Sequence, residues 1–366
     1  MDNQKIINLS NTIVNYSLEI KEGDNVQIDF THNARDLVKE LIKQIKEKKA
    51  NVFLRMTDTI LNADAAISST NKRIDTIKKT RELEVELMDV YIHIRETEND
   101  YETKNVEPEI LKEFGKALKK VSDIRVNERR WVLIDYPTKL DAYKNKMTSD
   151  EFREFAFDVM TVDYKKMSND VKPLVNLMNN TDKVKITGPG TDISFSIKGI
   201  GSVPCVGERN IPDGECYSAP VKTSVNGVIT YNVASPYQGD IYHNVSLTFK
   251  DGKIVNATSD NDDKRLNEIF DTDEGARYIG EFALGFNPRI TKPMGNILYD
   301  EKILGSLHFT PGKCYRDADN GNESSIHWDM VLIQTKKFGG GEIYFDDVLI
   351  RKDGMFIQEE LKHLNG

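Results

Sequence analysis

Apolar and polar positions follow two different rhythms along this chain, and the change falls near residue 180. In the first half, short apolar runs typical of buried strands occur at 25–30, 51–56, 89–96 and 130–137. Amphipathic segments with the period of a helix occupy 34–50, 107–124 and 148–160, and Thr148 or Ser149 is placed to cap the last one. Strands alternating with helices of this length predict a Rossmann-like α/β domain around a mostly parallel sheet.

After residue 180, short runs alternate between apolar and polar residues and are separated by Asn, Gly, Asp and Pro, as in VITYNVASP and EIYFDDVLI. This period of two predicts a mainly antiparallel α+β domain, with one helical stretch near 261–283. The sequence GPGTD at 188–192 lies between two such runs, KVKI and ISFSI, and predicts a hairpin turn. We expect the domains to comprise residues 1–175 and 176–366.

Charge and composition narrow the possible partners. With 50 basic and 59 acidic residues, the chain carries a formal charge of −9, and its basic residues form no long run. Such a chain is a poor partner for nucleic acid or for an anionic membrane surface. The start of the sequence lacks the regions of a secretory signal, and no run approaches the ~20 apolar residues of a membrane span. We therefore expect a cytoplasmic protein that binds neither nucleic acid nor membrane.

Two classes of site find no support in the sequence. The turn after the first strand, THNARD, has no glycine that would let the backbone approach a pyrophosphate, so we expect no dinucleotide cofactor. The three cysteines, Cys205, Cys216 and Cys314, have no CxxC spacing, which argues against a zinc ribbon and against a disulfide framework.

The run SSIHWDMVLIQ at 324–334 has the composition of a short strand and carries a histidine and an aspartate two positions apart. Residues i and i+2 of a strand share a face, so His327 and Asp329 would offer two ligands to one metal ion. Taken alone, such a pair is more often a carboxylate that orients a structural histidine. The neighbouring segments must therefore decide between the two interpretations.

Two glutamates extend the pair. In NIPDGECYSAP (210–220), a turn at Pro212 and Gly214 delivers Glu215 to the start of a strand, although a surface carboxylate is the usual reading of such a residue. In YIGEFALGFNP (278–288), Glu281 stands in an apolar run. Burying a carboxylate is costly unless it is paired or binds a metal, so we expect Glu281 to have a partner.

The segment GSLHFTPGKCYRD (305–317) adds His308 and, seven positions later, Tyr315, each of which alone is more typical of core packing. Carboxylates mixed with two imidazoles suit a pair of first-row divalent ions such as Zn²⁺, Co²⁺ or Mn²⁺. Two such ions about 3.5–4 Å apart suit the activation of water at a carbonyl or phosphoryl centre. The candidate metal ligands are Glu215, Glu281, His308, Tyr315, His327 and Asp329.

These segments resemble the signature regions of the M29 metallopeptidases, the family of aminopeptidases T and S. The likeness is carried by RNIPDGECYSAP, YIGEFALGFNP and NESSIHWDMV, and by the step from His308 to Tyr315. It extends into the first half through residues 130–152 and 187–197, so it spans most of the chain. The link from Tyr315 to His327 and the closing GGGEIYFDDVLIRKDG are shorter and more compact than in the better-known members.

The resemblance implies an α/β N-terminal domain, a two-metal centre in the C-terminal domain, removal of N-terminal residues from peptides, and a homodimer. In such a mechanism one ion polarises the scissile carbonyl and a water bound by both ions attacks it. Glu281 or Glu215 would bridge the ions, and a nearby carboxylate would act as the general base. Tyr315 would either bind a metal or donate a hydrogen bond to the oxyanion.

Two other functions stay open at this point. The first is a two-metal hydrolase of another amide or of a phosphoester, for which Arg209, Arg289 and Arg316 lie near the ligands in sequence. The second is a non-catalytic metal-binding relative. The presence of all six candidate ligands argues against this second possibility, because a protein without activity has no need of an open metal site.

Overall fold

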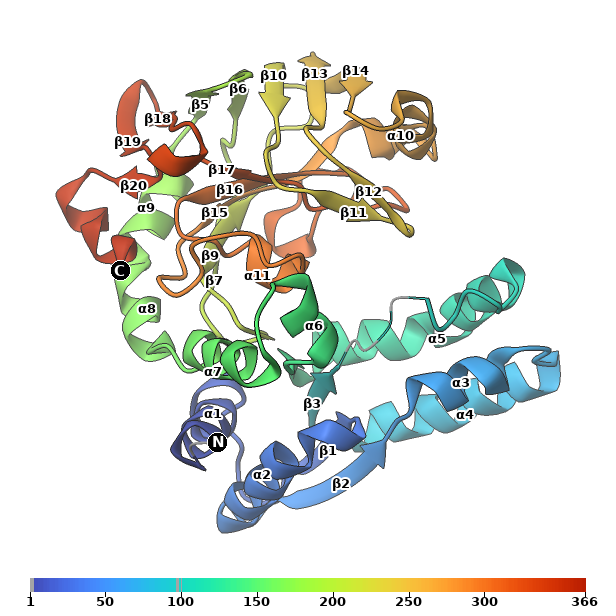
Figure 1. The fold of residues 1–366 in the computed structure, drawn as a ribbon. Coiled ribbons are helices and arrows are strands. Elements are labelled where there is room, and N and C mark those ends of the chain that lie inside the picture. Colours follow the sequence, from blue (N-terminus) through green and yellow to red (C-terminus); the bar gives the residue numbers. More distant parts are fainter. Residues whose placement is uncertain (1–2, 97–98, 100) are drawn as a thin grey trace. The chain divides into compact units, whose positions relative to one another are not determined.

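The computed structural model describes residues 3–96, 99 and 101–366, which form two compact units (Figure 1). The first unit comprises Met1–Val162 with Gly207–Pro212, and the second comprises Asp163–Val206 with Asp213–Gly366. The chain thus enters the second unit before residue 175, where we expected the domain boundary, and returns once to the first unit. Helices α8 (Tyr164–Asp170) and α9 (Lys172–Asn180) account for the early entry, because both pack against elements of the second unit.

A five-stranded sheet forms the centre of the first unit, in the order β2-β1-β3-β4-β8, and every neighbouring pair is parallel. The predicted Rossmann-like α/β architecture is therefore confirmed. The strands are β1 (Asn25–Phe30), β2 (Asn51–Met56), β3 (Val90–Arg95), β4 (Arg130–Asp135) and β8 (Asn210–Ile211). The helices are α1 (Asn3–Thr12), α2 (Arg35–Glu47), α3 (Thr59–Ala66), α4 (Asn71–Leu87), α5 (Pro108–Glu128), α6 (Lys139–Lys144) and α7 (Ser149–Met160).

Local sequence explains where these helices lie. Helix α2 buries Leu37, Leu41 and Ile45 on one stripe, as its apolar period predicts. Helix α7 begins after Thr148, whose side chain accepts a hydrogen bond from the backbone of Glu151 while the Glu151 carboxylate bonds back to Thr148. This reciprocal cap satisfies two backbone donors that a helix start leaves without partners. The cap expected at Thr148 is thus confirmed.

The second unit is built from antiparallel sheets, as predicted. An eight-stranded sheet has the order β14-β13-β10-β6-β5-β18-β19-β20, a five-stranded sheet has the order β17-β16-β15-β9-β7, and β11 pairs with β12. The strands are β5 (Lys183–Gly188), β6 (Thr191–Ser196), β7 (Val203–Cys205), β9 (Glu215–Ser218), β10 (Asn226–Thr230), β11 (Ser235–Tyr237), β12 (Asp240–Tyr242), β13 (Ser246–Lys250), β14 (Lys253–Thr258), β15 (Ile279–Gly285), β16 (Ser306–Pro311), β17 (Val331–Ile333), β18 (Glu342–Phe345), β19 (Val348–Lys352) and β20 (Met355–Phe356). Its helices, besides α8 and α9, are α10 (Asp263–Phe270) and α11 (Ile297–Asp300).

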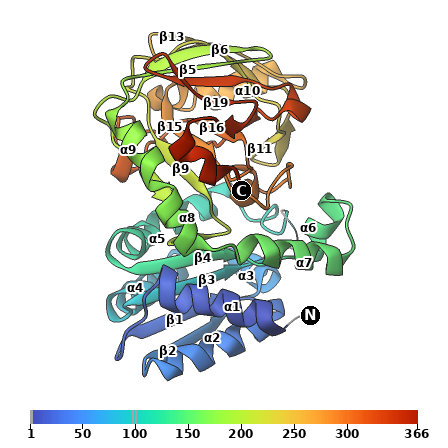
Figure 2. The same ribbon diagram turned by 90° about the vertical axis from the view of Figure 1, so that its left-hand side faces the viewer.

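Aromatic side chains fill the space between the two larger sheets of the second unit, which lie face to face in Figure 2. Phe195 of β6 contacts Phe282 of β15 and Phe309 of β16, each with a ring-centroid distance of 5.0 Å. Phe282 and Phe309 are fully buried. One face of the five-stranded sheet is therefore committed to the core, which leaves its other face for polar side chains.

Two expectations about elements were wrong in part. The helical stretch expected near 261–283 consists of α10 followed by a 3₁₀ turn at Glu274–Arg277. The residues from Ile279 onwards belong instead to strand β15, whose side chains alternate between the two faces of the sheet. The hairpin at GPGTD is confirmed, with β5 and β6 antiparallel. In 324–334 only Val331–Ile333 forms a regular strand, and His327 makes an isolated bridge with Gly312.

None of the helices in the described parts of the chain combines the length and the apolar character needed to cross a lipid bilayer.

Candidate metal centre

The strand register places the candidate ligands on the polar face of the five-stranded sheet. Residues paired across antiparallel strands share a face. Glu215 of β9 pairs with Gly285 of β15, and His308 of β16 pairs with Ala283 of β15. Glu281 lies two positions before Ala283 on the same strand and therefore on the same face. Three ligand candidates from three neighbouring strands thus converge, because the intervening residues face the core.

Small residues on the middle strand let the outer two ligands meet. Glu215 and His308 come from strands that flank β15, yet His308 Nδ1 lies 3.5 Å from Glu215 Oε2. Ala283 and Gly285 leave space for them to reach across. A Cβ atom on Gly285 would lie 2.5 Å from Ser306 Oγ, so this position does not accommodate a side chain without a shift of its neighbours.

Two glycines set the positions of the two glutamates. Gly214 has φ +137°, and a Cβ atom there would lie 2.9 Å from the Cβ atom of Asn287. The turn predicted to deliver Glu215 to a strand is therefore a place that requires glycine. Gly280 is the extra residue of a β-bulge between Ile279 and Glu281, and such bulges redirect the side chain that follows.

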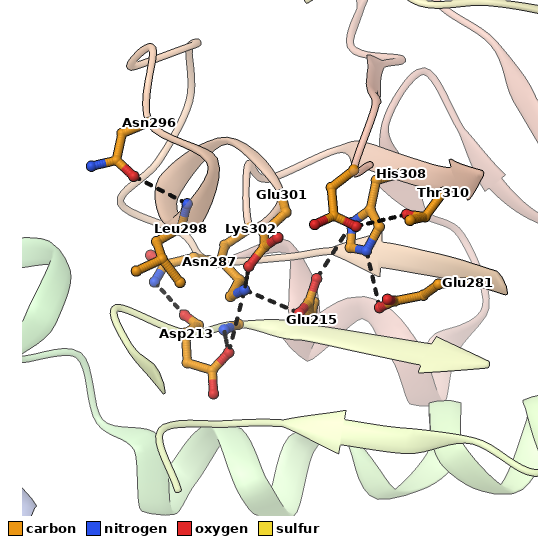
Figure 3. A network of polar contacts seen from close by, with 12 residues as sticks. Asp213, Glu215, Glu281, Asn287, Asn296, Leu298, Glu301, Lys302, His308 and Thr310 are labelled. Carbon is orange, nitrogen blue, oxygen red and sulfur yellow. Dashed lines mark hydrogen bonds and ion pairs between the residues drawn. The ribbon is translucent and has the colours of Figure 1, made fainter. Parts of the chain in front are cut away.

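The first group of candidate ligands is Glu215, Glu281 and His308, all buried (Figure 3). His308 Nε2 lies 3.1 Å from Glu281 Oε1, and its Nδ1 faces Glu215. Glu281 thus has the partner that its apolar surroundings predicted. Glu215 Oε2 and His308 Nδ1 are fully buried and make no hydrogen bond within the described chain.

The second group is Glu281, His327 and Asp329. His327 Nδ1 donates to the carbonyl oxygen of Lys313 at 2.7 Å, which leaves the lone pair of Nε2 free in the neutral ring. That Nε2 atom is 3.3 Å from Glu281 Oε2 and 3.2 Å from Asp329 Oδ1. Metal-binding histidines usually donate their other N–H in this way, so the tautomer fits a metal ligand.

Supporting contacts hold Asp329 in place, although it does not belong to a regular strand. Thr310, on β16, donates its hydroxyl proton to Asp329 Oδ1 at 2.8 Å. Trp328, between His327 and Asp329, stacks on Tyr237 at a centroid distance of 4.6 Å and packs on Phe270. The His-x-Asp pair therefore converges as expected. The segment outside the regular strand is held by backbone hydrogen bonds to residues 309–313 and by the packing of the Trp328 side chain.

Tyr315 lies at the edge of these groups. Its ring packs 4.8 Å from the His327 ring and 5.7 Å from the Tyr217 ring, and the residue is 50% exposed. The hydroxyl end of the ring is more enclosed than the residue as a whole, and this burial, together with the nearby carboxylates, raises the pKa of Tyr315 well above its ordinary value. The structure thus brings five of the six candidates into direct contact and places the sixth against one of them.

The buried carboxylates of the cluster favour the binding of positive charge. Burial raises the pKa of Glu215 to about 8. Burial by itself would lower the pKa of His308, but Glu215 and Glu281 outweigh it and raise that pKa to about 10. In the absence of metal ions, the neighbouring carboxylates therefore favour the protonated, positively charged forms of His308 and His327. The donor set of carboxylates and imidazoles, together with the buried atoms that lack hydrogen bonds, fits divalent metal ions.

Sequence reasoning missed a second layer of charged residues around Glu215. Lys302 is fully buried, and its Nζ atom lies 3.0 Å from Glu215 Oε1 and 3.9 Å from Asp213 Oδ1. Glu301 forms a further ion pair with the same ammonium group. The sequence YDEKILG offered a signal, because three charged residues, Asp300, Glu301 and Lys302, stand together between Tyr299 and the apolar Ile303 and Leu304.

Comparison with known proteins identifies the family of this chain. Residues 2–356 match the family described as thermophilic metalloprotease (M29). The chain is 25% identical to Aminopeptidase 2 of Geobacillus stearothermophilus over 64% of each chain, and 31% identical to Aminopeptidase AmpS of Bacillus subtilis (strain 168) over 39% of this chain and 37% of that one. The matched regions thus span less than two thirds of these relatives' own length.

The fold is that of a solved structure of wild-type AmpT from Thermus thermophilus. The two structures superpose with a TM-score of 0.77 at 18% identity, covering 98% of this chain and 100% of the other. Because the family match covers nearly the whole sequence, the chain belongs to the thermophilic metalloprotease (M29) family.

Proposed function

We propose that this protein is an aminopeptidase with a dinuclear metal centre, which releases N-terminal residues from peptides. The observation that carries the proposal is that Glu281 belongs to both ligand groups, one completed by Glu215 and His308 and the other by His327 and Asp329. Two adjacent groups that share a carboxylate are the arrangement expected for two ions acting on one water molecule. The names of the aminopeptidase relatives support a peptide substrate.

A count of charges supports two ions rather than one. Five carboxylates surround the centre, and the ammonium of Lys302 supplies one positive charge. Two divalent ions would bring the total to neutrality, and burying unbalanced charge is costly. Zn²⁺, Co²⁺ and Mn²⁺ all suit this mixture of ligands. The carboxylates are Asp213, Glu215, Glu281, Glu301 and Asp329.

We assign the bridging role to Glu281. Its Oε1 faces His308 of the first group, and its Oε2 faces His327 of the second. Glu215 fits a bridge less well, because its Oε1 is engaged by Lys302 and only Oε2 remains for a metal.

Bound ions would supply Lewis acidity at the scissile carbonyl and lower the pKa of a shared water molecule. The chain's own contribution is to position them, through Thr310 on Asp329 and the Lys313 carbonyl on His327. Tyr315 is half-exposed beside His327, where its hydroxyl would donate a hydrogen bond to the oxyanion. The negative charges around the centre would also attract the free amino group of a peptide.

A phosphoester substrate is the second candidate, and the positions of the cations favour a peptide instead. Arg289 and Arg316 are exposed, and within the described residues neither side chain contacts a candidate ligand. Arg209 belongs to the first unit and lies over the Trp131 ring. Lys302 is saturated by carboxylates. A phosphate-binding site would need cationic donors that are free to bind the substrate.

The test is a panel of aminoacyl amides and short peptides, assayed on metal-loaded, chelated and reloaded protein. We expect activity that disappears on chelation and returns with Zn²⁺, Co²⁺ or Mn²⁺. Peptides with a free N-terminus should be cut, and their N-acetylated forms should resist. Equal cleavage of the blocked peptides would indicate a general amidase instead of an aminopeptidase. Hydrolysis of phosphoesters alone would favour the second candidate function.

We further propose a homodimer and a cytoplasmic location. The first unit exposes large apolar side chains along β2, α3 and α4, a surface of the kind that a second copy would cover. All three cysteines are free, as is usual in a reducing compartment.

A further inference from the structure

A third group of metal-type side chains lies beside the proposed centre. Cys205, Asp213 and Glu215 each present a ligand atom, and these atoms lie within 4.8 Å of one another. The sheet register explains part of the convergence, because Cys205 of β7 pairs with Glu215 of β9 and so shares its face. One thiol and two carboxylates would suit a transition-metal ion.

The ammonium group of Lys302 lies beside Asp213 and Glu215, the two carboxylates of this group (Figure 3). Lys302 follows α11 and is fully buried. Its Nζ atom is 3.0 Å from Glu215 Oε1 and 3.9 Å from Asp213 Oδ1, and it is also paired with Glu301. A charged amine is thus held among three carboxylates, two of which belong to the group.

The contacts of Lys302 explain why an ammonium group is tolerated at a fully buried position. Glu215, Glu301 and Asp213 each present a carboxylate oxygen to its Nζ atom. A buried charge needs such partners, because taking it out of water is costly. The ammonium group and its three carboxylates therefore form one ion-paired unit.

We propose that Lys302 is a built-in cation that fills a latent third metal site formed by Cys205, Asp213 and Glu215. In doing so it acts as a positioning residue for Glu215, because it engages Oε1 and leaves only Oε2 for the dinuclear centre. This inference rests on the proposed dinuclear centre for its effect on Glu215. The latent site itself rests on the three side chains alone.

Replacing the ammonium by a neutral chain of similar length opens the site. In Lys302→Met, three carboxylates and a thiol would surround an uncompensated position, since Glu301 loses its partner as well. A divalent ion would restore the lost charge, and its binding would expel the thiol proton. Lys302→Arg keeps the charge and is the matched control.

The experiment is titration with Co²⁺, followed by metal analysis and by the near-ultraviolet thiolate-to-cobalt charge-transfer band. We expect two ions per chain and no thiolate band in the wild type and in Lys302→Arg. We expect a third ion and a thiolate band in Lys302→Met. The double variant Cys205→Ser with Lys302→Met should lose the band and bind the third ion at least about 10-fold more weakly.

Two results would overturn the inference. One is a thiolate band in the Co²⁺-loaded wild type. This measurement requires no variant, so it tests the inference even if Lys302→Met fails to fold. The other is a folded Lys302→Met protein with wild-type stoichiometry and no band. A failure of the proposed function would give a different result. A wild-type protein that binds no Co²⁺ would contradict the dinuclear centre, whether or not Lys302→Met binds an additional ion.

Discussion

Glu281 faces two imidazole rings at once, and its two oxygens are divided between them. A ligand that belongs to one group contributes to one ion, whereas a shared ligand contributes to both. Substitutions at the two kinds of position should therefore differ in the number of ions that they remove, and not only in activity.

We predict that Glu281→Gln loses both ions and that Asp329→Asn loses one. Activity in both variants should fall by more than about 100-fold, because an ion or its ligand is missing where charge develops. The measurement is metal content after gel filtration, with circular dichroism to check the fold. Equal loss of ions in the two variants would contradict the shared position of Glu281.

The role of Tyr315 can be separated in the same way. If its hydroxyl donates to the oxyanion, Tyr315→Phe should keep both ions and lower kcat by about 100-fold with little change in KM. If Tyr315 binds a metal instead, metal affinity will fall together with kcat. Tyr217→Phe, which alters the ring beside it, is the matched control.

Most of the candidate ligands could be predicted from the sequence, because a carboxylate or histidine within an apolar run is expected to be buried and therefore to have a partner. Glu281 is the clearest case, since the expected partner is present. Lys302 was missed for a physical reason. A lysine in a sequence is normally exposed, and only the folded chain brings Asp213, Glu215 and Glu301 around it to make burial tolerable.

At the scale of elements, a short 3₁₀ turn anchors the segment that carries His327. Asp273 caps this turn at Ala276 and also accepts hydrogen bonds from Ser324 and from the backbone and hydroxyl of Ser325. These contacts hold the start of the segment 324–334, in which only Val331–Ile333 forms the regular strand that we expected. Alternation of side chains alone did not reveal them, because they depend on a residue some fifty positions away.

We predict that Asp273→Asn destabilises the fold at neutral pH by about 1 kcal/mol, after allowance for solvent screening. Burial alone would raise the pKa of Asp273, but its hydrogen bonds outweigh burial and lower that pKa to about 2. A lowered pKa means that the stabilisation is present above the unfolded pKa and is lost as pH falls through the folded one.

The difference between wild type and Asp273→Asn should therefore shrink between about pH 4 and pH 2. Urea unfolding at a series of pH values measures it, with the exposed Glu323→Gln as the control. A difference that is constant across this range would mean that the carboxylate charge of Asp273 does not matter.

At the scale of the whole molecule, the sequence patterns predicted the parallel and the antiparallel units because each depends on many residues. They did not predict the return of the chain to the first unit at Gly207–Pro212. The returning segment contains β8, which pairs with β4. Because β8 has only two residues, it is too short to show the alternation of apolar and polar residues that identifies a strand in a sequence.

We predict that the chain forms a dimer through the apolar surface along β2, α3 and α4. The most exposed member is Leu61, at 66%. A stable interface buries about 800 Å² per partner, an area that several half-exposed large side chains provide. Light scattering should give about twice the 41.7 kDa chain mass, and Leu61→Glu should shift it towards the monomer.

Val255→Glu, on β14 of the second unit, is the control for a new charge at an exposed apolar position. A wild type that remains monomeric at micromolar concentration would remove this proposal without affecting the metal centre.

The alternation on β15 and β16 has an evolutionary consequence. Glu281 and His308 are each followed directly by a core phenylalanine, Phe282 and Phe309. Loss of a single codon within either strand would exchange the two faces and place a carboxylate or an imidazole in the core. Changes of length in descendants of this gene should therefore accumulate in the connecting loops, such as the one between Tyr315 and His327. A library of single-codon deletions would reveal this as a map of tolerated and forbidden positions.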